Sequence, residues 1–249
     1  MRGVVPLEPA AIVRDTALVI GNTDGIGLAL TRQLLDRGTE VIGISKRPST
    51  LVHEAYRHHV LDVSDDRYSE RLTEILPGAG LRLCIYCAGI GEWFALQDMA
   101  LDVLTLQVNL MGLARTASVI VPRLAANGGG VFAGLSSLAD LTPSSAAPAY
   151  AASKVGMSYY LEGLAAAVAR TRVAVVNVRL GFVDTKMAKA RRRPWMISAD
   201  AAARRILRSL TADRPSSRLN VPRRAALIFG MAEPFVRSLS RRKHQSRER

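Results

Sequence analysis

Cysteine and histidine are scarce in this sequence, with only two cysteines and four histidines among 249 residues. Structural zinc and iron–sulfur sites need more such ligands, so we expect no metal. Cys84 and Cys87 lie in an apolar run, 81–87, that predicts a buried strand, in which a spacing of three points the two side chains to opposite faces. We therefore expect no redox or metal motif there, and we expect a reducing cytoplasm because no secretory leader is evident.

Aromatic residues and long apolar runs are also few. Aromatics make up 5% of the chain and are not interleaved with arginines, which argues against a base-stacking platform for nucleic acid. No run of about 18 apolar residues occurs, so no transmembrane segment is expected. Apolar residues at 49% and charged residues at 22% are typical of soluble globular proteins, so we expect a folded domain.

Acidic residues are scarce in the last quarter of the chain. Residues 1–185 hold 16 basic and 17 acidic residues, whereas residues 186–249 hold 18 basic and 4 acidic ones. Such asymmetry favours an anionic substrate, an acidic protein partner or an acidic membrane surface, and it is equally typical of a solvated arginine-rich surface.

Apolar runs alternate with helix-period segments along the chain. The predicted strands are Ala17–Ile20, Val41–Ile44, Val60–Asp62, Leu81–Cys87, Val131–Leu135, Val173–Val178 and Leu219–Val221. The predicted helices are Gly27–Arg37, Asp65–Leu76, Leu101–Ala126, Tyr150–Ala169, Ala199–Leu210 and Arg223–Leu239. We therefore expect one α/β domain over residues 1–240, a doubly wound (Rossmann) parallel sheet of about seven strands with helices on both faces, and a disordered basic tail, 241–249.

A glycine-rich turn, residues 21–27, follows the first predicted strand and opens the first predicted helix. Gly21, Gly25 and Gly27 let the chain turn tightly and let a pyrophosphate approach the amides at the helix N-terminus. This context predicts a dinucleotide site.

The spacing Gly-x-x-x-Gly-x-Gly of this turn resembles that of the short-chain dehydrogenase/reductase family. Four further residues, Asn109, Ser137, Tyr150 and Lys154, match that family's Asn-Ser-Tyr-Lys tetrad in order and spacing. The resemblance covers nearly the whole chain, and four motifs in register make it specific.

Tyr150 and Lys154 stand four residues apart on a helical pattern, so both project from one helix face. A tyrosine with a pKa of about 10 is a poor acid or base at neutral pH, but a neighbouring ammonium lowers that pKa. We therefore predict a lowered pKa for Tyr150 and acid–base catalysis on a carbonyl. The resemblance implies that Tyr150 protonates the carbonyl oxygen and that Ser137 hydrogen-bonds it. It also implies that Lys154 holds the nicotinamide ribose and that Asn109 supports a proton-relay water.

The segment that follows the second predicted strand, Ser45-Lys46-Arg47, carries no carboxylate. An NAD site of this type usually has an Asp or Glu about twenty residues after the glycines, which holds the ribose hydroxyls. Two adjacent cations match a 2′-phosphate better, so NADP(H) is the expected cofactor. Asp24 argues the other way, because many NADP-dependent relatives carry a basic residue just before the second glycine.

The resemblance implies further cofactor contacts from the loops after later strands. The expected cofactor-binding residues are Gly21, Thr23, Asp24, Gly25, Ile26, Gly27, Ser45, Lys46, Arg47, Asp62, Val63, Cys87, Ala88, Gly89, Tyr150, Lys154, Val183 and Thr185. The chain departs from the family pattern at Ile20, at Tyr86–Cys87 and at Leu180–Gly181. None of these departures removes a catalytic group.

The family has a substrate lid after this region, here about residues 184–200. Its cations are Lys186, Lys189, Arg191, Arg192 and Arg193. They favour an anionic or carrier-bound substrate, and equally a solvated loop. Three aromatic residues, Trp93, Phe94 and Trp195, are candidates either for the substrate pocket or for the core.

Together these observations predict an NADP-dependent ketoreductase, which reduces a ketone or oxidises the corresponding alcohol on a small to medium organic substrate. Two alternatives stay open: a non-redox proton-transfer enzyme, such as a dehydratase or cyclase, and a nucleotide-bound sensor or scaffold for an acidic partner. The resemblance implies a homodimer or homotetramer that packs through the helices predicted around 101–126 and 150–169.

Overall fold

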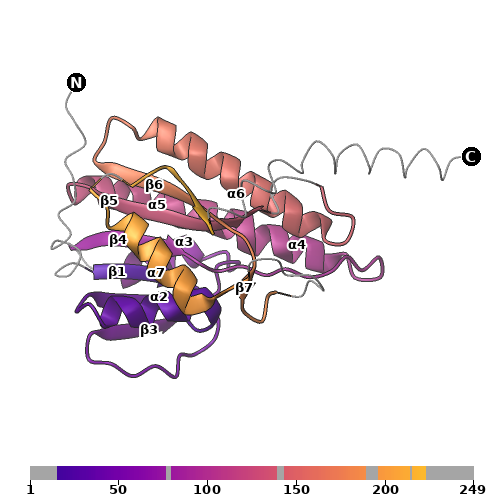
Figure 1. Cartoon of the computed structure of the whole chain (residues 1–249), viewed down its shortest axis with the longest axis horizontal. Coiled ribbons are helices and arrows are strands. Elements are labelled where there is room, and N and C mark those ends of the chain that lie inside the picture. Colours follow the sequence, from indigo (N-terminus) through magenta and orange to yellow (C-terminus); the bar gives the residue numbers. More distant parts are fainter. Residues whose placement is uncertain (1–15, 77–79, 139–142, 189–195, 214, 223–249) are drawn as a thin grey trace, which may run out of the picture.

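A seven-stranded parallel sheet forms the centre of the computed structural model (Figure 1), in which residues 16–76, 80–138, 143–188, 196–213 and 215–222 are described. Its strands run in the order β3–β2–β1–β4–β5–β6–β9. Their bounds are β1 Thr16–Ile20, β2 Glu40–Ser45, β3 Tyr56–Val60, β4 Leu81–Tyr86, β5 Gly130–Ser137, β6 Val173–Leu180 and β9 Arg218–Val221. All six strand pairs are parallel. This confirms the predicted doubly wound α/β fold.

Helices cover both faces of the sheet, because most strands are apolar on both sides. Helices α2 (Gly25–Leu35) and α7 (Ala199–Leu210) pack on one face. The other face is covered by α3 (Tyr68–Ile75), α5 (Gly112–Ala126) and α6 (Pro148–Ala167). Cys84 belongs to the core on the α5 side, whereas Cys87 packs against the core on the α2 side. The prediction of opposite faces for the two cysteines is therefore confirmed.

Polar caps and a proline begin the helices that carry or adjoin the site. The Asp24 carboxylate accepts the Gly25 amide at the start of α2, and the Ser198 hydroxyl accepts the Ala201 amide at the start of α7. Pro148 occupies the first turn of α6, where its missing N–H costs no intrahelical hydrogen bond.

Two predicted elements differ from the structure. The third strand is Tyr56–Val60, not Val60–Asp62. The prediction relied on the apolar residues Val60 and Leu61. The observed strand is mostly polar, which its position at the edge of the sheet permits, and buried Leu61 belongs to the following loop. A short second sheet, β7 (Val183–Asp184) paired with β8 (Ile197–Ser198), was not predicted. The predicted helix Arg223–Leu239 and the boundary at residue 240 lie outside the described residues.

The helix predicted over 101–126 is continuous but not uniformly α-helical. It consists of α4 (Ala100–Leu106), a π-helical turn η1 (Gln107–Met111) and α5. Ala100–Ala126 is long and apolar enough to cross a membrane by length and composition, a test that core helices of globular proteins also pass. Its residues Leu113, Ile120 and Leu124 are fully buried in the core beneath the sheet, as in the core helix of a globular domain.

Candidate active site

The candidate site lies where the carboxyl ends of the strands meet the loops that follow them. Gly21 follows β1, Cys87 follows β4, and Ser45 and Ser137 end β2 and β5. The chain winds outward in one direction from β1 and in the other from β4, and such a reversal of strand order is where open α/β sheets bind ligands.

The glycine-rich turn is held close to two other parts of the site. Gly21 has a φ of 83°, and a Cβ there would lie 2.6 Å from the Ala88 amide nitrogen. Gly25 has a φ of 52°, and a Cβ there would lie 3.1 Å from Thr185 Cγ2. Only glycine suits both the backbone angles and these approaches. The turn therefore contacts the Cys87–Gly89 loop and the Val183–Thr185 segment. Residues of three predicted cofactor-binding motifs thus lie side by side.

Asp24 connects this turn to two cations. Its Oδ2 atom lies 2.8 Å from Lys186 Nζ and 3.9 Å from Arg47 Nη2, while its Oδ1 caps α2. The hydrogen bond from Lys186 is the largest cause that holds the pKa of Asp24 below its usual value, while partial burial opposes it. Asp24 thus neutralises part of the positive charge that the N-terminus of α2 and these cations provide.

The end of β2 lies next to the turn. Thr23 Oγ1 and Ser45 Oγ are 3.0 Å apart, and Ser45 Oγ donates to the Arg47 carbonyl oxygen at 2.9 Å. Lys46 and Arg47 are both exposed. The structure therefore brings Thr23, Asp24, Ser45 and Arg47 together.

A buried polar group under this edge was missed by sequence reasoning. Asn22 is fully buried, and its Nδ2 donates to Tyr56 Oη and lies 3.3 Å from His58 Nδ1. His58 Nε2 donates to the Arg47 carbonyl oxygen at 2.9 Å. Asn22 Oδ1 is buried and has no hydrogen-bond partner in the part of the chain that the structure describes. The alternation Tyr56-x-His58 was the available signal, because it places both side chains on one face of an edge strand.

Other predicted contacts line the same edge. Leu61 N–H donates to the Ser45 carbonyl oxygen at 3.0 Å, which brings the Asp62–Val63 pair beside the end of β2. Asp62 Oδ1 accepts from the amide and the hydroxyl of Ser64, at 2.9 and 2.7 Å. Asp62 therefore shapes this loop.

Tyr150 and Lys154 lie one turn apart on α6 and face Ser137 at the end of β5. The Ser137 hydroxyl hydrogen-bonds to Tyr150, and Lys154 Nζ lies 5.6 Å from the centroid of the Tyr150 ring. Gly91 is packed against that ring, since a Cβ there would lie 3.1 Å from ring carbon Cδ2 of Tyr150. The structure thus brings these predicted catalytic side chains together.

Burial governs the protonation of both groups on α6. It raises the pKa of Tyr150, and the hydrogen bond between Tyr150 and Ser137 opposes this only in part. The predicted lowering of that pKa is therefore wrong, because desolvation of the phenolate outweighs the hydrogen bond with Ser137. Burial also lowers the pKa of Lys154 to about 8. The partners of its ammonium are neutral, namely the Leu135 carbonyl oxygen at 2.8 Å and Met157 Sδ at 3.5 Å.

Asn109 is fully buried in the π-helical turn η1 and joins two neighbouring segments. Its Oδ1 accepts from the Ile90 amide at 2.8 Å, and its Nδ2 donates to the Ile90 carbonyl and to Ser153 Oγ, both at 2.9 Å. A Cβ on Gly89 would lie 3.3 Å from Asn109 Oδ1 and 3.8 Å from Lys154 Nζ. Asn109 therefore holds the loop after β4 beside Lys154.

These features fit a dinucleotide. The glycine turn leads into the N-terminus of α2, whose backbone amides suit a pyrophosphate. Lys154 is a buried cation whose partners are neutral, and Asn22 Oδ1 is a buried acceptor that has no hydrogen-bond partner among the described residues.

The segment predicted to be a substrate lid is described only in part. Lys186 is exposed and bonded to Asp24, whereas Lys189, Arg191, Arg192, Arg193 and Trp195 lie outside the described residues. Trp93 and Phe94 are 51% and 41% exposed, so neither is a core residue. In the described ranges, no group of three or more His, Cys, Asp or Glu side chains could hold a metal.

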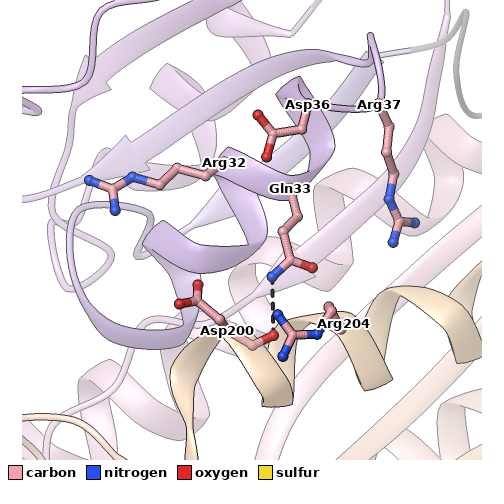
Figure 2. Close-up of a pocket in the computed structure, with 6 residues that line it drawn as sticks. All are labelled: Arg32, Gln33, Asp36, Arg37, Asp200 and Arg204. Carbon is pink, nitrogen blue, oxygen red and sulfur yellow. Dashed lines mark hydrogen bonds between the residues drawn. The ribbon is translucent and has the colours of Figure 1, made fainter.

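A surface depression of about 390 Å³ between α2 and α7 lies elsewhere (Figure 2). It is lined by Arg32, Gln33, Asp36, Arg37, Asp200 and Arg204. Gln33 Nε2 donates across it to the Asp200 carbonyl oxygen at 3.1 Å. Because Arg32 and Asp36 stand at the C-terminal end of α2, the depression lies at the opposite end of that helix from the glycine turn and is separate from the candidate active site.

Sequence comparison identifies the family. The model of the short chain dehydrogenase family matches residues 15–195, so the chain belongs to the short-chain dehydrogenase/reductase family, a family of oxidoreductases.

Similar proteins include a probable NADP-dependent dehydrogenase of Haemophilus influenzae, 27% identical over 67% of this chain and 71% of that protein. A very-long-chain 3-oxoacyl-CoA reductase of Bos taurus is 24% identical over 73% of this chain and 63% of its own length, so this chain spans less than two thirds of that enzyme. A short chain dehydrogenase from Burkholderia cenocepacia, solved in complex with NADP, has a TM-score of 0.78 at 21% identity, covering 92% of this chain and 96% of that one. This last likeness supports the fold.

Proposed function

We propose that the protein is an NADP-dependent oxidoreductase that reduces a ketone on a small to medium organic substrate, or oxidises the corresponding alcohol. The convergence of Ser137, Tyr150 and Lys154 at the carboxyl edge of the sheet carries this proposal. The NADP in the names of the Haemophilus relative and the Burkholderia structure supports the cofactor.

NADPH, when bound, would supply a hydride for the carbonyl carbon and would be oxidised to NADP⁺. Tyr150 supplies the proton to the carbonyl oxygen, and its raised pKa keeps the phenol protonated at neutral pH until negative charge develops on that oxygen. The Ser137 hydroxyl donates a hydrogen bond to the same oxygen. Lys154, charged below a pH of about 8, favours the phenolate that Tyr150 leaves behind. Asn109 keeps the loop after β4 next to these groups, and we retain the proposal that it supports a proton-relay water.

Arg47 and Lys46 are proposed to bind the 2′-phosphate. They directly follow β2, where a carboxylate would favour NAD, and the Arg47 backbone is held by Ser45 and His58. Gly21, Ile26 and Gly27 are proposed to face the pyrophosphate. Asp62, Val63 and the Cys87–Gly89 loop are proposed to surround the adenosine, and Val183 and Thr185 to contact the nicotinamide.

Two further proposals concern the protein's surroundings. A homodimer or homotetramer is supported by exposed apolar residues of α4, η1 and α6, among them Val103, Met111 and Tyr159. A reducing cytoplasm is supported by the free thiols of Cys84 and Cys87. Light scattering coupled to size-exclusion chromatography would measure the molar mass of the assembly and therefore its number of subunits.

Parallel titrations with NADPH and NADH at fixed ionic strength test the cofactor, with nicotinamide fluorescence as the signal. We expect NADPH to bind at least about tenfold more tightly, because its extra phosphate makes charge-assisted hydrogen bonds. Arg47→Ala is expected to remove most of this preference. Arg57→Ala is the matched control, since Arg57 is an exposed arginine on the neighbouring strand that pairs with Glu40. A preference for NADH would overturn the cofactor proposal.

Mass analysis of products from a panel of ketones and 3-oxoacyl thioesters tests the reaction. A gain of two hydrogens together with NADPH oxidation supports reduction. Turnover without that mass change would favour the non-redox alternative, and binding of neither nucleotide would favour a scaffold.

A further inference from the structure

Tyr86 stands where the chain departs from the family pattern, at the last position of β4. Its side chain is fully buried, and its Oη donates to the Val108 carbonyl oxygen at 2.5 Å. Burial holds the pKa of this phenol well above its usual value, so it remains a hydrogen-bond donor at any pH at which the protein works. This phenol takes no part in the proposed proton or hydride transfer.

The acceptor belongs to the π-helical turn that carries Asn109. The Gly112 amide donates to the Gln107 carbonyl, five residues earlier, whereas an α-helix would direct it to Val108. The Val108 carbonyl, which the α-helical register would use, accepts from Tyr86 instead. The phenol therefore supports the wider register of this turn.

Gly112 makes room for the phenol. A Cβ at this position would clash with Tyr86 Oη and would lie 3.0 Å from Val63 Cγ2. A tyrosine at the end of β4 and a glycine one residue after the π-helical turn are therefore a matched pair.

The register of the turn decides where Asn109 points. Asn109 follows Val108 directly, and its side-chain amide binds both backbone groups of Ile90 and the Ser153 hydroxyl. Through Ile90 it holds Gly89 and Gly91, which lie next to Lys154 and the Tyr150 ring.

We propose that Tyr86 is a positioning residue for the reaction, one that fixes the π-helical turn and thereby holds Asn109 and the loop after β4 against the catalytic groups. Its role in turnover rests on the proposed function. Its role in the turn does not, and the two can be measured separately.

Tyr86→Phe tests this inference, because it keeps the ring and removes only the hydroxyl. Tyr68→Phe is the matched control: Tyr68 is equally buried in the same core, and its Oη lies 2.7 Å from Oγ1 of Thr116, eight residues beyond Val108 in the same continuous helix. Gly112→Ala is a second variant that displaces the phenol by another route.

Hydrogen exchange of the Ile90 amide, which Asn109 Oδ1 accepts, is the readout independent of activity. We expect exchange at Ile90 to quicken by about tenfold or more in Tyr86→Phe and Gly112→Ala, and to stay unchanged in Tyr68→Phe. Equal exchange at Ile90 in the Tyr86 and Tyr68 variants would overturn the inference.

Turnover of the fastest ketone of the panel is the second readout. We expect kcat of Tyr86→Phe to fall by about tenfold, with KM and NADPH affinity within about twofold of the parent, because misplacement acts on the chemical step. In an Asn109→Ala background the same substitution should have no further effect on kcat. If exchange at the Ile90 amide were faster in Tyr86→Phe but kcat were unchanged, the role of Tyr86 in the reaction would be overturned. The proposed reduction of a ketone would not be affected by that result. If the parent protein reduced no ketone, the proposed function would fail, and exchange at Ile90 would still decide whether Tyr86 holds the turn.

Discussion

At the β5–α6 end of the site, Lys154 is 5% exposed and bonded to a main-chain carbonyl, whereas at the β2 end Arg47 and Lys186 have side chains that are 65% and 85% exposed. Both ends carry cations that we propose lie beside the bound NADP(H). Desolvation moves the pKa of the buried cation, while solvent and salt screen the exposed ones. Substitutions at the buried end should therefore have large effects that resist salt, and those at the exposed end small effects that salt removes.

The largest effect is expected at the buried end, from Tyr150→Phe. Loss of the proton donor should reduce kcat by at least about a hundredfold, because general acid catalysis contributes that much or more. NADPH affinity should change by less than about threefold, since the ring remains packed against Gly91. Steady-state rates and a fluorescence titration of the same preparation measure both. Retained turnover would remove Tyr150 from the mechanism.

An intermediate effect is expected from pH, again at the buried end. The free-protein pKa of Lys154 is about 8, depressed from its ordinary value of 10.5, and a bound anion favours the ammonium. NADPH affinity should therefore be level below pH 8 and fall by up to about tenfold per pH unit above it. Titrations between about pH 6.5 and 9.5 test this. The Lys154→Met variant should bind NADPH more weakly, and its NADPH affinity should not depend on pH in this range. If the pH profile of the variant matched that of the parent, the pH dependence would belong to another group.

The smallest effect is expected at the exposed end, from Asp24→Asn. Asparagine still caps α2, but the charge that neutralises Arg47 and Lys186 is lost. NADPH affinity should rise by about two- to fivefold at low salt, and the gain should vanish near 1 M salt. Asp36→Asn, at the other end of the helix, is the control and should show no gain. A gain that persisted in high salt would contradict the screened character of this end.

Local spacing is the reason the buried end was predictable. Tyr150 and Lys154 are four residues apart on one helix, and Ser137 was chosen by its distance along the chain from Tyr150. The direction of the Tyr150 pKa was not predictable in this way, because it depends on how the loop carrying Gly91 and the end of β5 enclose the phenol.

Contacts between distant residues are the reason the exposed end was predicted less well. Asn22 meets Tyr56 and His58, which lie 34 and 36 residues further along the chain, only because β2 and β3 pair in one register. Because the third strand was predicted at Val60–Asp62, the pairing of Tyr56 and His58 with β2 could not be predicted. The sequence-based prediction considered only the negative charge of Asp24. In the structure Lys186, 162 residues further along the chain, hydrogen-bonds to that carboxylate. The alternation of strands and helices, by contrast, was enough to predict the sheet.

The two-stranded sheet of β7 and β8 has an evolutionary consequence. Val183 pairs with Ile197 and Asp184 with Ser198, so two points that lie 14 residues apart in the sequence are held side by side. A change in the length of the intervening segment then costs little, since doubling a closed loop adds only about 0.6 kcal/mol. Residues on either side of the excursion, such as Thr185 beside the glycine turn and Ser198 at the start of α7, would keep their places. Insertions and deletions beyond Lys186, whose ammonium is bonded to Asp24, can therefore accumulate in descendants of this gene without altering the packing around the glycine turn.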